Sequence, residues 1–381
     1  MSKFMLLGMT AAATLAASPS LFAEDAGVED RSPVVYVIPM AGQMGTDIHP
    51  SIYEEIIEDA NEIKPDLIVF RLDSADVDTN FHIQNDDRRE FGMWQNIEVY
   101  RDMMTDLQNK LPVDLDNQVM WIEDAVGPST LFALSFPNIY MTKDARFWGL
   151  DAVQRFADGW SDPDVRAKMY AAWVGIASGF GQAGGYPLEL IWAMIEPQRS
   201  LGVKFEGREV AWSNDLAGTY WTIDGNPEAV ARFNSDSAEN VMLSKGTVLD
   251  LDDLMFLLGH REYQVADSGQ QLAEKYVEGW RRAFERCESL MKDARDREAG
   301  GTIADLGASK KAWEKILSAG RRYPAVAARL QQDYGLDLFS IETRIERMKK
   351  QIQDSRKNGR STGGGAGRGG RGGRGGGLGG G

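Results

Sequence analysis

The chain has 381 residues, 43% of them hydrophobic, and a formal net charge of −15. This is enough apolar material for one large domain with a helical appendage. The single cysteine, Cys287, excludes an intramolecular disulfide, so a hydrophobic core must supply the stability. The net negative charge disfavours binding to nucleic acid or to anionic membrane surfaces. It favours a basic, cationic or neutral polypeptide partner.

Residues 1–23 have the pattern of a secretory signal peptide. Lys3 provides the positive start, residues 4–17 form a short apolar stretch, and Ala23 ends a small-residue cleavage site. The stretch is too short and too rich in Ala and Thr for a typical membrane span. An uncleaved membrane anchor is the alternative interpretation. No other segment approaches about eighteen apolar residues. We therefore expect a periplasmic or secreted mature chain without a transmembrane segment, opening with a linker over 24–33.

The charge is distributed unevenly along the chain. Residues 355–381 contain basic residues and no acid. Without this segment and without Lys3, the folded body carries about −22, so we expect it to repel polyanions.

Apolar runs and helical faces alternate between residues 34 and 122. The pattern predicts strands over 34–38, 67–72 and 119–122, with helices over 50–63 and 91–111 between them. Near-continuous apolar strands separated by helices are typical of a largely parallel α/β sheet that is covered on both faces.

The stretch from residue 117 to residue 150 holds the strongest candidate for a site. Its strand is followed by Glu123 and Asp124, and then by the small-residue corner Gly127-Pro128-Ser129. A short helix over 130–136 and a strand over 139–141 follow. Backbone N–H groups at such a helix start can hold an anion or a developing oxyanion. The alternative is an ordinary connection in which Ser129 is the N-cap of the helix.

The middle of the chain continues as a mixture of helices and short strands. The pattern predicts helices over 164–180, 187–195 and 251–258, short strands or a hairpin within 203–221, a loop over 226–240 and one more strand over 241–250.

The last third is helical up to a tail rich in glycine and arginine. Helices are predicted over 268–297, 310–319, 324–334 and 341–354, either as an oligomer contact or as a bundle packed on the sheet domain. We expect a homo-oligomer. Residues 355–381 have too few apolar side chains to form a core and are predicted to be disordered. This tail would act either as a flexible tether that contacts polyanions or as a plain linker.

Several stretches resemble a known superfamily. The matching segments, in chain order, are Val34–Gly45, Ile52–Asp66, Leu67–Ser74, Val126–Phe136, Ile139–Met141, Lys168–Met194 and Lys245–Asp252. Their order resembles the ClpP/crotonase superfamily, and more narrowly the periplasmic ClpP-class serine peptidases of the SppA and NfeD types. The resemblance implies a ClpP/crotonase-like domain over 34–267, followed by a helical region over 268–354.

The resemblance also implies a chemistry, namely acyl transfer by a serine with a lysine as base and no cofactor or metal. Counting back from 139–141, the nucleophile position falls on Gly127, and Ser129 lies two positions later. Lys168 is the lysine nearest to the position of the base. Gly127 and Gly42 would supply the N–H groups of the oxyanion hole.

Two functions remain open at this point. The first is a degenerate relative that binds polypeptides or scaffolds an envelope assembly, in which Ser129 caps the helix and Lys168 points to solvent. The second is an active peptide hydrolase that uses Ser129 and Lys168. An acyl-CoA enzyme is disfavoured, because export removes it from the CoA pool and its body is acidic.

Overall fold

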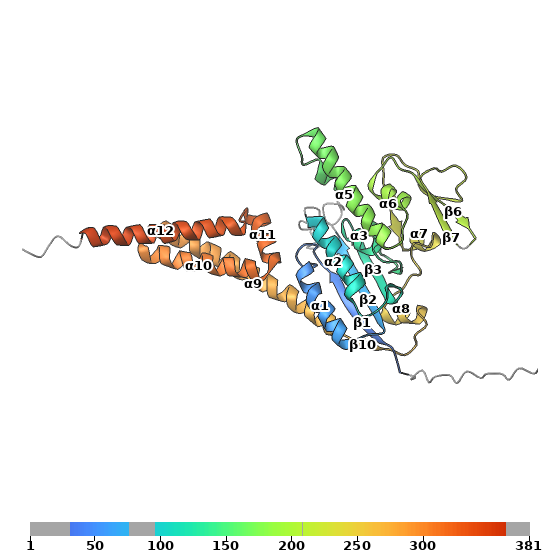
Figure 1. Ribbon diagram of the computed structural model, residues 1–381, viewed down its shortest axis with the longest axis horizontal. Coiled ribbons are helices and arrows are strands. Elements are labelled where there is room, and N and C mark those ends of the chain that lie inside the picture. Colours follow the sequence, from blue (N-terminus) through green and yellow to red (C-terminus); the bar gives the residue numbers. More distant parts are fainter. Residues whose placement is uncertain (1–30, 76–95, 208, 363–381) are drawn as a thin grey trace, which may run out of the picture. The chain divides into compact units, whose positions relative to one another are not determined.

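The computed structural model describes residues 31–75, 96–207 and 209–362. The described residues from Pro33 onward belong to one compact unit. Its centre is a sheet in the order β10-β1-β2-β3-β5-β9, with β4 also paired to β3 (Figure 1). The strands are β1 (Val34–Ala41), β2 (Leu67–Ala75), β3 (Gln118–Val126), β4 (Ile139–Met141), β5 (Arg146–Trp148), β9 (Phe233–Asn234) and β10 (Gln264–Ala266).

Every pairing in this sheet is parallel except that between β5 and β9. The predicted α/β class with a largely parallel sheet is therefore confirmed. The strands begin where the apolar runs begin, within a residue or two, because continuous apolar sequence suits a strand that is covered on both faces. β1, β2 and β3 run beyond the predicted ends at 38, 72 and 122.

Alternate residues of the central strands enter two separate cores. Tyr36, Ile38 and Met40 belong to a large core that also contains side chains of the helices α1 (Pro50–Ile63), α2 (Ile97–Lys110), α3 (Ser129–Leu134), α5 (Pro163–Ala183) and α6 (Leu188–Ile195). Val35 and Val37 face the opposite side and pack with α8 (Leu251–Leu257). Successive side chains of a pleated strand point to opposite faces of the sheet, so every second residue enters the same core.

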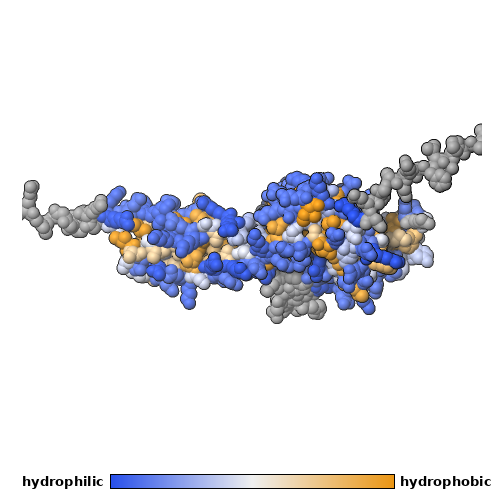
Figure 2. Space-filling model, turned by 90° about the horizontal axis from the view of Figure 1, so that it is seen from below, coloured by the Kyte–Doolittle hydropathy of each residue, from blue (hydrophilic) through white to orange (hydrophobic). Residues whose placement is uncertain are grey.

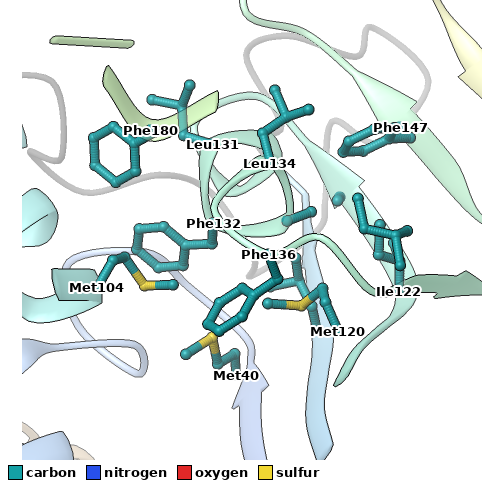
Figure 3. Packing of buried hydrophobic residues seen from close by; sticks show 14 of the residues in the cluster. Met40, Met104, Met120, Ile122, Leu131, Phe132, Leu134, Phe136, Phe147 and Phe180 are labelled. Carbon is teal, nitrogen blue, oxygen red and sulfur yellow. The ribbon is translucent and has the colours of Figure 1, made fainter. Parts of the chain in front are cut away.

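The helix α3 is buried on every side. All six of its residues are buried. Figure 3 shows Phe132 pointing towards Met104 and Phe136, just beyond the helix, lying between Met40 and Met120. The hydroxyls of its two polar residues, Ser129 and Thr130, donate to backbone carbonyls, so the whole helix can lie inside the protein.

The remaining elements of this part include a small second sheet. It is antiparallel, in the order β7-β6-β8, and consists of β6 (Leu201–Glu206), β7 (Glu209–Ser213) and β8 (Trp221–Asp224). The hairpin predicted within 203–221 is thus confirmed. The strand β5, the 3₁₀ turn Leu115–Asn117 and the helix α4 (Ala152–Ala157) were not predicted as such.

Two predictions for residues 226–250 are wrong. The expected loop contains β9 and the helix α7 (Ser235–Asn240), which begins at a capping box on Asn234 and Ser237. The expected strand over 241–250 is irregular, since Met242 has a φ of 58°. This segment still lies along β4, because the Lys245 and Val248 N–H groups donate to backbone carbonyls of that strand.

The C-terminal helical region, which we call the arm, consists of α9 (Ser268–Gly300), α10 (Ile303–Arg322), α11 (Pro324–Tyr334) and α12 (Leu338–Thr362). It has its own core around Trp280, Phe284 and Trp313. The first turns of α9 pack on the sheet instead, where Gly269 lies against the Tyr36 ring. One continuous helix therefore contributes to both cores.

The predicted ends of the chain lie largely outside the described residues. The signal peptide over 1–23 and the tail beyond residue 362 stay predictions, as do the domain boundaries. α12 does extend past the tail's predicted start at residue 355. None of the described helices is long and apolar enough to cross a membrane. The face shown in Figure 2 is mostly hydrophilic, with separate apolar patches.

Candidate functional site

The small-residue corner between β3 and α3 is a tight turn, as expected. Gly127 has a φ of +84°, a left-handed conformation that favours glycine. Its N–H donates to the Trp148 carbonyl at 2.8 Å. The position that the resemblance assigns to the nucleophile therefore has neither a side chain nor a free amide.

Ser129 is completely buried at the first position of α3. Its Oγ donates to the Ser74 carbonyl at 2.8 Å and to the Val126 carbonyl at 3.3 Å. Ser74 Oγ in turn donates to the Gly42 carbonyl at 2.8 Å. These bonds link the ends of β1, β2 and β3.

The prediction that Ser129 is the N-cap of this helix is wrong. The N-cap residue is Pro128, and no side chain caps the helix. An N-cap oxygen accepts from a backbone N–H, whereas Ser129 Oγ donates to carbonyls.

Lys168 lies in the first half of α5 and is exposed. Among the described residues, the structure records neither a hydrogen bond nor an ion pair for Lys168. Ser129 bonds only to backbone carbonyls. The structure therefore does not bring these two side chains together, and their catalytic roles stay a prediction.

Gly42, the second expected oxyanion donor, opens the loop after β1. It has a φ of +97°, and its N–H donates to the Asp73 carbonyl at 2.9 Å. An added Cβ would lie only 2.6 Å from Asp47 Oδ2. The loop is thus closed around Asp47, and the N–H of Gly42 is occupied like that of Gly127.

Asp47 is a buried carboxylate that connects this loop to the arm. Its Oδ2 accepts from the Gln43 N–H at 3.0 Å and from the Arg281 guanidinium at 2.9 Å. Its Oδ1 accepts from Trp280 Nε1 at 3.2 Å. Sequence reasoning missed this residue, because its partners lie more than 230 positions away in the chain.

The sequence predicts Glu123 and Asp124 just after a strand. Both lie within β3. Glu123 pairs with Arg71 at 2.9 Å, and Asp124 is buried in a two-pronged pair with Arg146. Each carboxylate is therefore matched by a guanidinium, an arrangement that fixes its geometry.

His49 caps the helix α1. Its Nδ1 accepts from the Ser51 N–H at 3.2 Å and lies 2.9 Å from Ser51 Oγ. Burial lowers the pKa of His49 to about 4, so the ring is neutral near pH 7. An imidazole is a common general base, but the bonds of Nδ1 here serve the helix start.

A pocket of about 520 Å³ lies beside His49, at the loop that follows the carboxyl end of β1. Its walls come from the loop after β1, from the start of α2 and from α11. The lining residues are Gly45, His49, Pro50, Asn96, Val99, Tyr100, Pro324, Ala328, Gln331 and Gln332. None of these side chains is charged at neutral pH, and three of them are amides. The carboxyl edge of a parallel sheet is the usual place for a ligand.

Sequence reasoning missed this pocket, because four of its ten lining residues come from α11. In the sequence, Gln331 and Gln332 occupy positions that are typical of the polar face of a surface helix. No group of three or more His, Cys, Asp or Glu side chains within 31–75, 96–207 and 209–362 is placed to hold a metal ion.

Comparisons with known proteins add little. No family model matches the chain, and no curated protein matches it. Two solved structures of the 1510-N membrane-bound stomatin-specific protease are similar at 12% identity. The structure of a lysine-to-alanine mutant in complex with a substrate peptide has a TM-score of 0.35. The match covers 59% of this chain and 80% of the protease chain. A serine-to-alanine mutant gives 0.37, covering 63% and 91%. A likeness at this level establishes neither family nor activity.

Proposed function

We propose that this chain is a ClpP-like protein without hydrolytic activity that binds polypeptide segments. The observation that carries the proposal is the Ser129 hydroxyl, which is completely buried and donates to backbone carbonyls. A serine nucleophile needs an adjacent base and access to its substrate. In this structure Ser129 holds strand ends together instead.

The backbone around the corner supports the same proposal. An oxyanion hole needs N–H groups that are free to meet the developing charge. The amides of Gly42 and Gly127 already donate to Asp73 and Trp148. An incoming carbonyl would have to replace bonds that maintain the ends of the strands.

The pocket beside His49, at the loop after β1, is the proposed binding site. Its amides at Gln331 and Gln332 suit the N–H and C=O groups of an extended peptide, and the half-exposed Val99 gives an apolar contact. The lining is uncharged, so a neutral segment fits best. The amino-terminal pattern favours an exported protein, and we place this binding in the cell envelope, as part of a homo-oligomer.

The second candidate is an active Ser/Lys peptide hydrolase. It is favoured by the position of Ser129, two residues after the left-handed Gly127 and at the start of a helix. This function requires that Ser129 Oγ and the Lys168 amine approach to about 3–4 Å, directly or through one water. The corner would have to open for this to happen.

Binding of a fluorescein-labelled peptide of alternating leucine and serine tests the proposed pocket. We expect Val99→Asp to weaken binding about tenfold, because an unpaired carboxylate would have to be buried under the peptide. Val165→Asp is the matched control, since Val165 is also exposed on a helix but lies outside the pocket. Equal binding by both variants and the unmodified protein would contradict the assignment of the pocket.

A further inference from the structure

The arm has a groove between α9 and α10, with a volume of about 920 Å³. The α9 wall runs from Gly279 to Leu290, and the α10 wall from Lys315 to Tyr323. None of its lining residues belongs to the pocket described above. The groove is of a size that binds ligands.

The rim of this groove is cationic in an otherwise acidic protein. Four basic side chains line it, namely Arg282, Arg286, Lys315 and Arg322, against the single acid Glu285. The whole chain carries −15. Like charges at i and i+4, such as Arg282 and Arg286, cost helix stability. A concentration of positive charge at this point therefore calls for a counter-charge.

The structure supplies little of that counter-charge. Arg282 pairs with Glu278 at 2.8 Å, and Arg322 lies over the Tyr323 ring. Among the described residues, neither Arg286 nor Lys315 has an ion-pair or hydrogen-bond partner. Other arm cations do have partners, as in the pairs Arg297–Asp293 and Arg329–Asp333.

The floor of the groove is apolar. Ala283, Leu290 and Ala319 are half-buried there, and Cys287 beneath them is buried. A ligand that fills the groove therefore meets cations along its sides and methyl groups below. This combination fits a polypeptide ligand that carries both carboxylates and apolar side chains. A bare polyphosphate would make no contacts with the apolar floor.

We propose that the groove between α9 and α10 binds an acidic, partly apolar polypeptide segment of a partner protein. Charge complementarity to the rim provides attraction and orientation, and the apolar floor provides contact area. A nucleic acid would meet the same rim, but the negative body repels it. This site does not depend on the proposed function of the pocket beside His49, which takes a neutral segment.

Fluorescence anisotropy with a fluorescein-labelled peptide of repeated Glu-Glu-Leu triplets tests the proposal on the full chain. The groove variant carries Arg286→Gln, Lys315→Gln and Arg322→Gln. The control variant carries Arg368→Gln, Arg371→Gln and Arg374→Gln, which remove the same charge from the glycine-rich tail. We expect the groove variant to bind about tenfold more weakly and the control to bind like the unmodified protein.

Two further measurements complete the test. Ser318→Glu adds one carboxylate to an exposed position in the groove and keeps all four cations, so it should weaken binding without disturbing the fold. Binding should also weaken between about 0.1 M and about 1 M salt, as the Debye length falls from about 10 Å to about 3 Å. Loss of binding in the tail variant but not in the groove variant would overturn the proposal. So would tighter binding of single-stranded DNA than of the peptide.

Discussion

At the scale of single residues, the hydroxyl of Ser129 has a structural role. It bridges β2 and β3 by donating to Ser74 and Val126 from a fully buried position. Thr130 makes the corresponding link to β5, since its Oγ1 donates to the Trp148 carbonyl at 2.8 Å. The first turn of α3 is thus attached to three strands by side-chain hydroxyls.

Ser129→Ala should destabilise the protein by about 1–3 kcal/mol, because a buried carbonyl loses its hydrogen-bond donor. Chemical denaturation measures this loss. Ser289→Ala is the matched control, since Ser289 is exposed on α9, and its removal should change stability by less than about 0.5 kcal/mol. Equal stability of the Ser129 variant and the unmodified protein would argue that the hydroxyl is not structural.

His49 should make folding depend on pH between about 4 and about 6.5. Burial lowers its pKa to about 4 in the folded protein, below the ordinary histidine value of 6.5. Between these values the unfolded chain binds the proton and the folded chain does not, so stability rises with pH and is fully present above about 6.5. His49→Asn keeps a capping oxygen and cannot titrate. The variant should show a smaller slope in urea unfolding over this range, and an unchanged slope would contradict the role of burial.

At the scale of elements, β3 is the strand with the most neighbours, because it pairs with β2, β4 and β5. Its side chains reach both cores, Ile122 on one face and Trp121 on the other. The prediction from the sequence that both are buried is confirmed, with exposures of 0% and 6%.

Trp121→Ala should cost about 3 kcal/mol, at the lower end of the range for a buried aromatic residue. The lower end is expected because the indole N–H of Trp121 is buried without a partner and its removal relieves that cost. Trp160→Ala is the control, since Trp160 is 44% exposed beside α5. A Trp121 variant as stable as the Trp160 variant would show that the face covered by α8 contributes little.

The helix α9 is attached to the loop after β1 through Asp47. Arg281→Gln should cost about 1.5–3 kcal/mol, because the buried carboxylate loses a charged donor. Its neighbour provides the control, since the exposed pair of Arg282 with Glu278 should contribute less than about 1 kcal/mol. Thermal or urea unfolding of the two glutamine variants compares them directly. Equal losses would mean that the contact with Asp47 is as weak as a surface pair.

The elements that the sequence predicted well are those with a continuous pattern. α1 and α11 have the predicted bounds, because proline at their first turns and an apolar face define them locally. The segment over 241–250 was mispredicted because Val241, Leu243 and Val248 are buried in an irregular chain. Burial alone makes such a run resemble a strand.

At the scale of the whole molecule, the features that the sequence could not predict are contacts between distant segments. The corner at Gly127 could be placed from its small residues. The bonds from Ser129 to Ser74, the salt bridge from Asp47 to Arg281 and the pocket wall from α11 could not, because no local pattern specifies a partner so far along the chain.

These distant contacts bear most strongly on function. They occupy the Ser129 hydroxyl and the Gly42 and Gly127 amides, which catalysis would need. The neutral pocket beside His49 and the cationic groove between α9 and α10 are not occupied by other parts of the described chain. These contacts support our proposal that the protein holds polypeptides and does not cleave them.

Labelling with a fluorophosphonate probe, read by intact mass, tests this central claim most directly. The probe forms a covalent bond only with a serine that a base has activated. We expect the purified protein to gain no adduct mass under conditions that fully label an active serine hydrolase, both with and without Lys168→Ala. A stoichiometric adduct that disappears in Ser129→Ala, while that variant remains folded, would contradict the claim and establish a peptide hydrolase.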